Sequence, residues 1–268
     1  MRKIPKTTTK SRKNIIRKKH SKRKTQSKKS GGAPSPPVTD YSNQDLSNNN
    51  FSDMNLKGVN FSGAKLSGAN FSGANLTGAT LSGVDLEGAN LEGANLEGVD
   101  LSDLDLESLN MQRVNLQDAE LNKVNLTGAN LTGANLKFAN IQHSLLIGSN
   151  FTGANLEGAI LTGADLSWAN FSGANLTGAN LTGANLTDGY LGNANLTGAD
   201  MTAVITNDNT IFTLANFTDI TVEDDSVLRS MLDPPTSTST STLREQLLQR
   251  KSVKLTEYAE NPFKNGIL

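Results

Sequence analysis

Apolar side chains recur at every fifth residue from Leu46 to Met201. All thirty-two positions in this register are Leu, Phe, Met or Ile, and a smaller residue, most often Ala, stands two positions before each. Asn or Asp usually lies between the two, as in Ala-Asn-Leu-Thr-Gly at residues 174–178. A helix repeats at about 3.6 residues and a half-buried strand at 2, so a strict period of 5 predicts a repeat architecture.

The unit resembles the Ala-(Asp/Asn)-Leu-x-x motif of the pentapeptide-repeat family. The resemblance implies an all-β fold, a right-handed quadrilateral β-helix in which four units form one square coil. It also implies that the large central residue and the small one before it point inwards, and that the other three point outwards. Counting the degraded units at both ends, we expect about eight to nine coils.

The phenylalanines support a coil of twenty residues independently of the family. Phe51, Phe71, Phe151 and Phe171 are separated by multiples of twenty, so such a coil would place them on one inner face, whereas Phe61 falls on another. At the start, Gln44 and Asn49 occupy small inward positions. These polar substitutions predict a first coil that closes the rod.

The register slips by one residue after Met201. Phe212, Phe217 and Val222 resume the spacing of five, one residue out of phase. We therefore predict a one-residue bulge or loop near Asn207–Thr210, followed by about three more units, with the β-helix covering residues 40–222.

The last segment, residues 223–268, has the pattern of two short helices joined by a Ser/Thr linker. A hydroxyl cap at Thr221 and the following acidic residues predict a first helix, which Asp233-Pro234-Pro235 would stop. Thr242 with Glu245 forms a capping box for a second helix to about Glu260. The first helix is expected to cap the last coil.

The net charge of −1 conceals a strong asymmetry. Residues 1–30 contain fourteen Lys or Arg and no acidic residue, whereas residues 40–225 contain five basic and twenty-two acidic residues. Such a basic segment has too few apolar side chains to form a core, so residues 1–39, which end in a Pro/Gly linker, are predicted to be a disordered arm.

The basic arm is predicted to bind a polyanion or an acidic protein surface. A solubilising tail, a nuclear-targeting signal and a transit peptide are the alternatives. The residues assigned to this binding are Arg12, Lys13, Arg17, Lys18, Lys19, Lys22, Arg23, Lys24, Lys28 and Lys29.

The sequence lacks the motifs of common catalytic and metal sites. It contains no phosphate-binding loop, no His-Glu-x-x-His and no nucleophile elbow. The two histidines, His20 and His143, cannot form a triad or a histidine metal cluster, and cysteine is absent. We therefore predict a non-enzymatic protein with no cofactor, no metal and no small-molecule substrate. A cation held by Asp103, Asp105 and Glu107 is a weaker alternative.

Two groups of outward residues depart from the repeat: an acidic face and an apolar contact patch. The acidic face would bind a cationic partner, or its charges are simply screened by water and salt. The apolar patch would contact another protein, or a local distortion at His143–Ile147 turns some of its side chains inwards. The acidic face comprises Asp85, Glu87, Glu92, Glu97, Asp105 and Glu107, and the apolar patch comprises Leu145, Ile147 and Trp168.

Three functions remain after these observations. The first is a structural or adaptor protein, a rigid rod tethered by its basic arm to other proteins of a large assembly such as a virus capsid or a nucleoprotein particle. In a virus capsid it would be a minor capsid protein. Nucleic acid is a further candidate partner of the arm. The second follows from the family, some of whose members mimic DNA and act on type II topoisomerases. The third, an enzyme fusion, lacks any catalytic constellation.

The chain has no apolar run long enough to span a membrane and no signal-peptide core. We therefore expect a cytoplasmic, nuclear or virion-associated protein that is neither inserted in a membrane nor secreted. Its oligomeric state is not predicted by the sequence.

Overall fold

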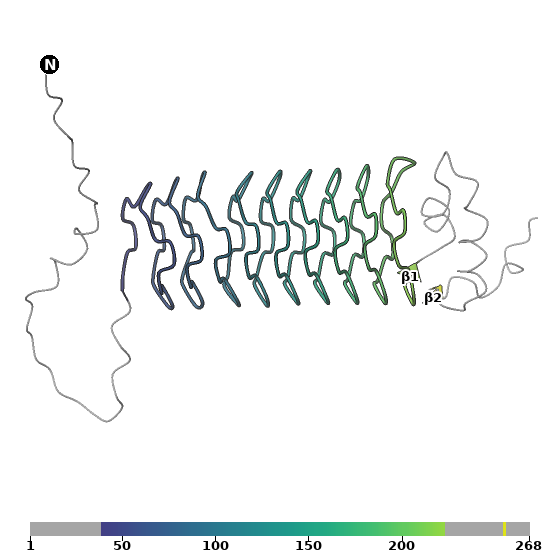
Figure 1. Cartoon of the computed structure of the whole chain (residues 1–268), viewed down its shortest axis with the longest axis horizontal. Helices are drawn as coiled ribbons and strands as arrows, with labels where there is room; N and C mark the ends of the chain where they lie inside the picture. The colour runs from purple at the N-terminus through teal and green to yellow at the C-terminus, as the bar shows by residue number, and fades with distance from the viewer. Residues whose placement is uncertain (1–38, 223–253, 256–268) are drawn as a thin grey trace, which may run out of the picture. The chain divides into compact units, whose positions relative to one another are not determined.

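The structure, a computed structural model, describes residues 39–222 and the two-residue strand at Lys254–Leu255. Residues 39–222 wind into a rod of stacked coils (Figure 1). Parallel bridges join residues twenty apart, from Asp40–Asn60 up to Asn185–Ile205. The predicted right-handed quadrilateral β-helix is therefore confirmed. Nine turns lie between Asp40 and Thr221, which at a strand spacing of about 4.8 Å gives a rod of about 43 Å.

Each five-residue unit forms one side of the square and one corner. At a typical side, the Leu121 amide donates to the Asn140 carbonyl above (2.7 Å), and the Glu120 amide donates to the Val99 carbonyl below (3.1 Å). The corner residue adopts a left-handed conformation, for example with φ of 64° at Gly148 and 62° at Trp168. Glycine is common at the corners because it adopts positive φ without the steric cost that a side chain brings.

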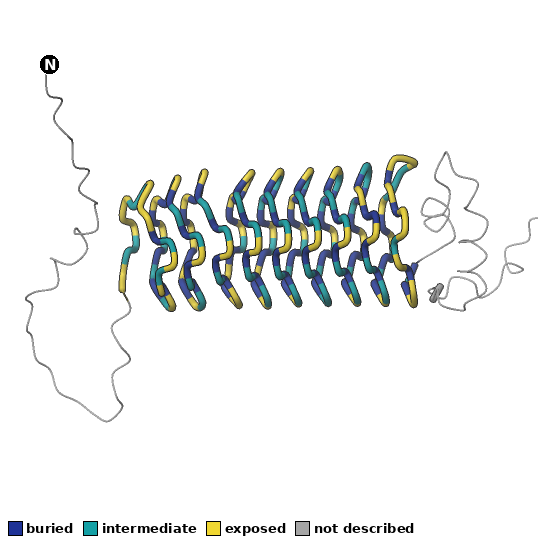
Figure 2. Tube along the Cα trace, viewed as in Figure 1, coloured by how far each residue is buried: buried dark blue, intermediate teal, exposed yellow. Residues whose placement is uncertain are grey.

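The core is a continuous column of buried central and small residues (Figure 2). The predicted phenylalanine face is present: the rings of Phe51 and Phe71 stack with centroids 4.9 Å apart, and those of Phe151 and Phe171 stack at 4.8 Å. Alternation along each unit therefore places the apolar side chains inside and leaves the Asn, Ser and Thr side chains outside.

The first coil is the open N-terminal end of the ladder. Gln44 and Asn49 are exposed although they occupy inward positions, because theirs is the first coil of the described rod. The Tyr41 ring stacks on that of Phe61 at 5.4 Å and covers part of the core at this end. Polar residues at the two inward positions are thus consistent with an end coil.

The predicted one-residue insertion is present before the last coil. The bridge spacing changes from 20 to 21 at Tyr190–Ile211, and Phe212 and Phe217 are buried in the new register. Thr210 takes the small inward position, where its hydroxyl donates to the Leu186 carbonyl at 3.1 Å. This hydrogen bond satisfies a hydroxyl at a position that is otherwise apolar.

The C-terminal prediction is wrong at the described positions. Thr221–Val222 form strand β1, with Thr221 paired to Asp200 below and Val222 buried in the core, so the predicted end of the β-helix at 222 is confirmed but the helix start assigned to Thr221 is not present. Strand β2 (Lys254–Leu255) lies inside the predicted second helix and pairs in parallel with β1, because the open upper edge of β1 offers main-chain partners. The rest of both predicted helices lies outside the described residues.

Candidate interaction surfaces of the rod

The acidic face lies where the sequence predicts outward positions. Asp85 and Glu87 are exposed on one side of the square, and Asp105 and Glu107 are exposed on the same side one coil higher. The Asn125 amide group donates to Asp105 Oδ1 at 3.0 Å from the coil above. No corresponding bond links Asp105 to Asp85, because both side chains are acceptors when ionised.

The other two acidic residues lie on neighbouring sides. Glu92 forms an ion pair with Arg113 and is half-buried, whereas Glu97 is exposed and accepts a bond from the Asn115 side chain at 3.4 Å. The acidic face is therefore a band around part of the rod, and its unneutralised charge is concentrated on the side that carries Asp85 and Asp105.

At this band, some of the main-chain hydrogen bonds between two neighbouring coils are missing. We call the interruption the ladder break, which separates residues 78–89 from residues 97–110. Figure 2 shows it as a wider spacing between two coils nearer the N-terminal end of the rod. Within the described rod, five amides fail to donate upwards although the equivalent amides one coil lower and one coil higher do so: Gly78, Leu81, Gly83, Leu86 and Gly88.

Three bonds in the opposite direction are missing as well. The amides of Asp100, Asp105 and Asn110 make no bond to the carbonyls of the coil below. On the side of Leu76 the ladder is intact, since Leu76 donates to Asn95 and Asn95 donates to Ala74, each at 2.8 Å. On the side of Leu91 one of the two bonds remains, from Leu91 to Asn110 at 2.9 Å. The ladder break thus removes the main-chain bonds of two adjacent sides of one coil boundary and one of the two bonds on the side of Leu91.

Two features of the sequence account for the ladder break. The coil above it has Val99, Leu104 and Leu109 at inward positions that usually hold Ala, so its core is larger than that of the coil below. The carboxylates of Asp85 and Asp105 would stack at strand spacing, which is unfavourable for like charges. Val84 and Leu104 consequently retain 9% and 7% exposure, whereas Val124 one coil higher has 0%.

Two aspartates in this part of the rod, Asp85 and Asp100, accept hydrogen bonds as ionised carboxylates, which makes the stability of the rod sensitive to acid. A hydrogen bond from the Ser67 hydroxyl, and then one from the Glu87 amide, lower the pKa of Asp85 below 3.8. The Ser102 amide and then its hydroxyl lower the pKa of Asp100. The ionised carboxylate is therefore the form that the folded chain favours.

We expect the stability that these two aspartates contribute to be lost in acid. Because their folded pKa values lie below the ordinary value of 3.8, that contribution is complete above 3.8 and disappears as the pH falls through the lower folded values. Thermal denaturation followed by circular dichroism should show a midpoint that falls in this range. The change should be smaller in the Asp85→Asn, Asp100→Asn variant, and an identical fall would contradict the assignment.

The apolar patch faces solvent. Leu145 is 46% exposed, Trp168 is 66% exposed, and Ile147 is half-buried. The ladder stays in register here, with Leu145 bridged to Asn125 below and Asp165 above. The alternative of a local distortion that turns these side chains inwards is therefore wrong.

The same coil has polar residues inside. Ser144 and Ser149 occupy small inward positions and are buried, and the Ser144 hydroxyl donates to the Leu121 carbonyl at 2.7 Å. Every buried side-chain polar atom of the described residues has a hydrogen-bond partner. This coil therefore has an unusual composition on both its inner and its outer surface, while its backbone keeps the regular ladder.

A second apolar surface near the C-terminal end was missed by sequence reasoning. Ile205 is 55% exposed, Ile211 42% and Leu214 77%, and Tyr190, bridged to Ile211, is 39% exposed. The signal was available: Ile205 and Ile211 occupy the outward position that is usually Asn or Asp, once the repeat is continued through the insertion.

The comparisons with known proteins agree with this geometry. A family model described as pentapeptide repeats matches residues 39–205 in eight copies. The chain belongs to the pentapeptide-repeat family. A search of curated proteins found no match.

Solved structures of other pentapeptide-repeat proteins share the fold. A trypsin-treated variant of QnrB1, a plasmid-mediated fluoroquinolone resistance protein, is 21% identical with a TM-score of 0.57, and the match covers 63% of this chain and 92% of that one. HetL from Nostoc sp. strain PCC 7120, a pentapeptide-repeat protein involved in heterocyst differentiation regulation, is 24% identical with a TM-score of 0.28, covering 74% and 93%. The first of these supports the β-helix fold.

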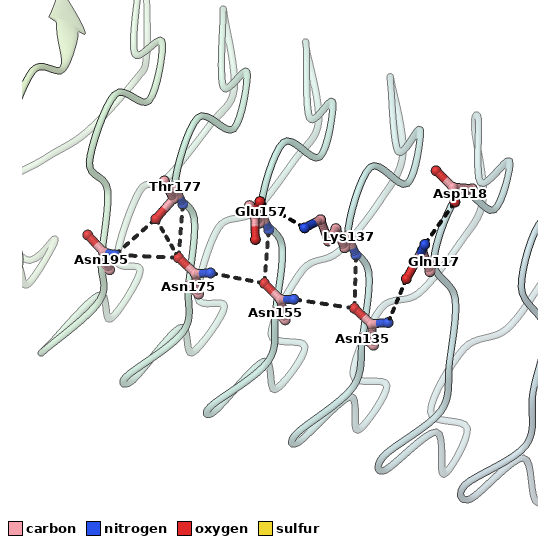
Figure 3. A network of polar contacts seen from close by, with 9 residues as sticks. All are labelled: Gln117, Asp118, Asn135, Lys137, Asn155, Glu157, Asn175, Thr177 and Asn195. Carbon is pink, nitrogen blue, oxygen red and sulfur yellow. Dashed lines mark hydrogen bonds and ion pairs between the residues drawn. The ribbon is translucent and has the colours of Figure 1, made fainter.

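One side of this pentapeptide-repeat rod carries a ladder of nine asparagines. Figure 3 shows its central part, where the Asn135 amide group lies near the Gln117 side chain, and Asn155 and Asn175 follow in line. Asn175 donates to Asn155 Oδ1 at 3.1 Å, and Lys137 pairs with Glu157 at 2.9 Å. The ladder comprises Asn55, Asn75, Asn95, Asn115, Asn135, Asn155, Asn175, Asn195 and Asn216.

The predicted polyanion-binding residues, Arg12 to Lys29, lie outside the described residues. Among residues 39–222 and 254–255, no group of three or more His, Cys, Asp or Glu side chains has the arrangement of a metal site. No helix in the described part of the chain is long and apolar enough to cross a membrane.

Proposed function

We propose that this pentapeptide-repeat protein is a non-enzymatic structural or adaptor protein, a rigid rod that its basic arm tethers to a large assembly and that contacts a second component through its apolar patch. The continuous buried column from Phe51 to Val222 carries this proposal. Each coil is bound to its neighbours by main-chain hydrogen bonds, so the stacked repeats form a rigid rod.

The attachment points are the basic arm and the apolar patch. The arm supplies a salt-dependent attraction to a polyanion or an acidic protein. Trp168 supplies a large exposed side chain of the kind that anchors protein contacts. A virus capsid or a nucleoprotein particle presents both types of surface, and the arm would meet them in the cytoplasm, the nucleus or a virion.

The experiment that tests this role captures partners with the full chain and with one arm variant, at low and high salt. The variant replaces Arg17, Lys18, Lys19, Lys22, Arg23 and Lys24 with Gln. We expect the full chain to capture assembly components at low salt and the variant to lose them. On duplex DNA as a defined probe, the slope of log affinity against log salt should become less negative by about five, at about 0.9 per lost contact.

A charge-preserving control separates electrostatics from sequence recognition. In this control each Lys among the same six positions becomes Arg and each Arg becomes Lys, so the arm keeps its charge. Because polyanion binding depends chiefly on charge, the control should capture the same partners as the full chain. Equal capture by the six-glutamine variant would contradict an attachment role for the arm.

One observation favours a second function, DNA mimicry directed at a type II topoisomerase. Residues 39–222 contain nineteen acidic and five basic residues, and only two ion pairs occur in the described part of the rod. If the rod acts in this way, the full chain and the six-glutamine variant should both inhibit supercoiling. Neutralising Glu87, Asp105 and Glu107 should abolish that inhibition, and no inhibition by the full chain would exclude this alternative.

A further inference from the structure

Strand β2 has the sequence of a repeat unit that is detached from the rod. Residues 253–256 read Val-Lys-Leu-Thr, which is the order of small apolar, outward, central and outward residues that Ala-Lys-Leu-Ser has at 64–67. The pairing of β2 with β1 keeps the register of the ladder, because Leu255 pairs with Val222, which is buried at a central position. β2 therefore extends one side of the rod by one more strand (Figure 1).

The direction of β2 indicates where the chain goes next. β2 is parallel to β1, so it runs around the rod in the same sense as the coils below it. In the coil below β1, the chain passes from Asp200, which is paired with β1, to Ile205 and then to Ile211 on the next two sides. A chain that continues beyond Leu255 in this sense reaches those two sides in turn.

Exposed apolar side chains lie on the sides that this chain would reach. Ile205 and Ile211 are 55% and 42% exposed, and Tyr190 lies one coil below Ile211. The Tyr190 ring lies along the wall of the rod, since a Cβ added at Gly192 would be 2.7 Å from its hydroxyl. A group of large apolar side chains on one end of a rod is typical of a contact site. We call this group the terminal apolar surface, which comprises Tyr190, Ile205, Ile211 and Leu214.

The thirteen residues that follow Leu255 have the length and the composition to cover this surface. One side of the rod takes five residues, so residues 256–268 are long enough to cross two sides. The five-residue pattern stops here, because Glu260 stands at the next central position and is unsuited to the apolar core. The segment therefore suits packing over outward apolar side chains. Its own large apolar residues are Tyr258, Phe263, Ile267 and Leu268.

We propose that the terminal apolar surface binds residues 256–268 of the same chain, which follow directly from β2. A segment held by a short tether has an effective concentration in the millimolar range, about a thousandfold above that of a second copy at about micromolar concentration. Binding within the chain therefore prevails over association of two copies through this surface. The inference does not depend on the attachment role of the basic arm or on the apolar patch around Trp168.

Thiol labelling of the full chain tests this proposal, because the chain contains no cysteine. The reporter is Ile211→Cys, at an outward position where the substitution leaves the core intact. Its thiol should react with a maleimide about tenfold more slowly than in the chain that also carries Tyr258→Ser and Phe263→Ser. Tenfold protection corresponds to a segment that is bound about ten times as often as it is free. The thiol of Leu145→Cys, in the apolar patch, should react at one rate with and without the two serine substitutions.

Two further variants control for composition and for the role of β2. Asn261→Ser, Asn265→Ser changes polar residues of the same segment and should keep the protection of the reporter thiol. Lys254→Pro removes a main-chain donor from β2 and should abolish the protection. Equal labelling with and without Tyr258 and Phe263 would overturn the proposal. Protection that rises with protein concentration would assign the surface to a second copy, and would overturn binding within the chain.

Discussion

Replacing Phe151 with Ala is expected to destabilise the rod by about 3–5 kcal/mol. The Phe151 side chain is completely buried, and its ring stacks on that of Phe171 at 4.8 Å in the middle of the column. Removing it leaves a cavity in an interior that relaxes only partly, and it removes a stacked pair that adds to the burial energy. Urea denaturation followed by circular dichroism measures the change.

Phe138→Ala is the matched control for this substitution. Phe138 has the same side chain but occupies an outward corner and is 51% exposed, with Lys137 above its ring at 4.9 Å. Because its removal creates no internal cavity, we expect a change within about 1 kcal/mol. Similar losses for the two variants would show that inward and outward positions are not energetically distinct, which would contradict the coil register.

Replacing Asp105 with Asn is expected to close the ladder break. Elsewhere in the rod, an Asn one coil above an Asp donates to its carboxylate, as Asn185 does to Asp165 at 3.1 Å and Asn60 to Asp40 at 3.1 Å. Asp105→Asn places such a donor above Asp85 and removes the repulsion between two stacked carboxylates. The amides of Leu81 and Leu86 should then exchange about tenfold more slowly for each ladder bond that forms.

Asp165→Asn is the control because its coil boundaries are already closed. Leu146 and Leu166 both donate to the next coil, at 2.8 Å each, so removing this one charge should leave their exchange unchanged. Unchanged exchange at Leu81 and Leu86 in Asp105→Asn would indicate that the large inward residues Leu104 and Leu109 alone keep the coils apart.

The rod contains units that follow the repeat and units that depart from it. A unit with Ala, Asn and Leu at the standard positions contributes to the column and to the polar ladders outside it. Units with unusual residues, such as those of Asp105, Leu145 and Trp168, keep the fold but change the surface. The functional proposals accordingly rest on the departures from the repeat.

The sequence by itself determined the coil length and the one-residue insertion before Phe212, and its resemblance to the pentapeptide-repeat family implied the fold. It did so because a period of five assigns each residue to an inward or outward position, and the spacing of the phenylalanines fixes which residues stack. It also placed Leu145 and Trp168 on the outside. These properties depend on the chemical character of single positions, which the sequence states directly.

Only the tertiary structure decided where neighbouring coils fail to meet, and that β1 pairs with β2 instead of beginning a helix. Both depend on interactions between residues twenty or more positions apart: the fit of Leu104 against the coil below, the stacking of Asp85 with Asp105, and the open edge of Thr221–Val222. Local propensity at Thr221 favours a helix cap, but pairing with Asp200 and burial of Val222 outweigh it because they continue a ladder that is already formed.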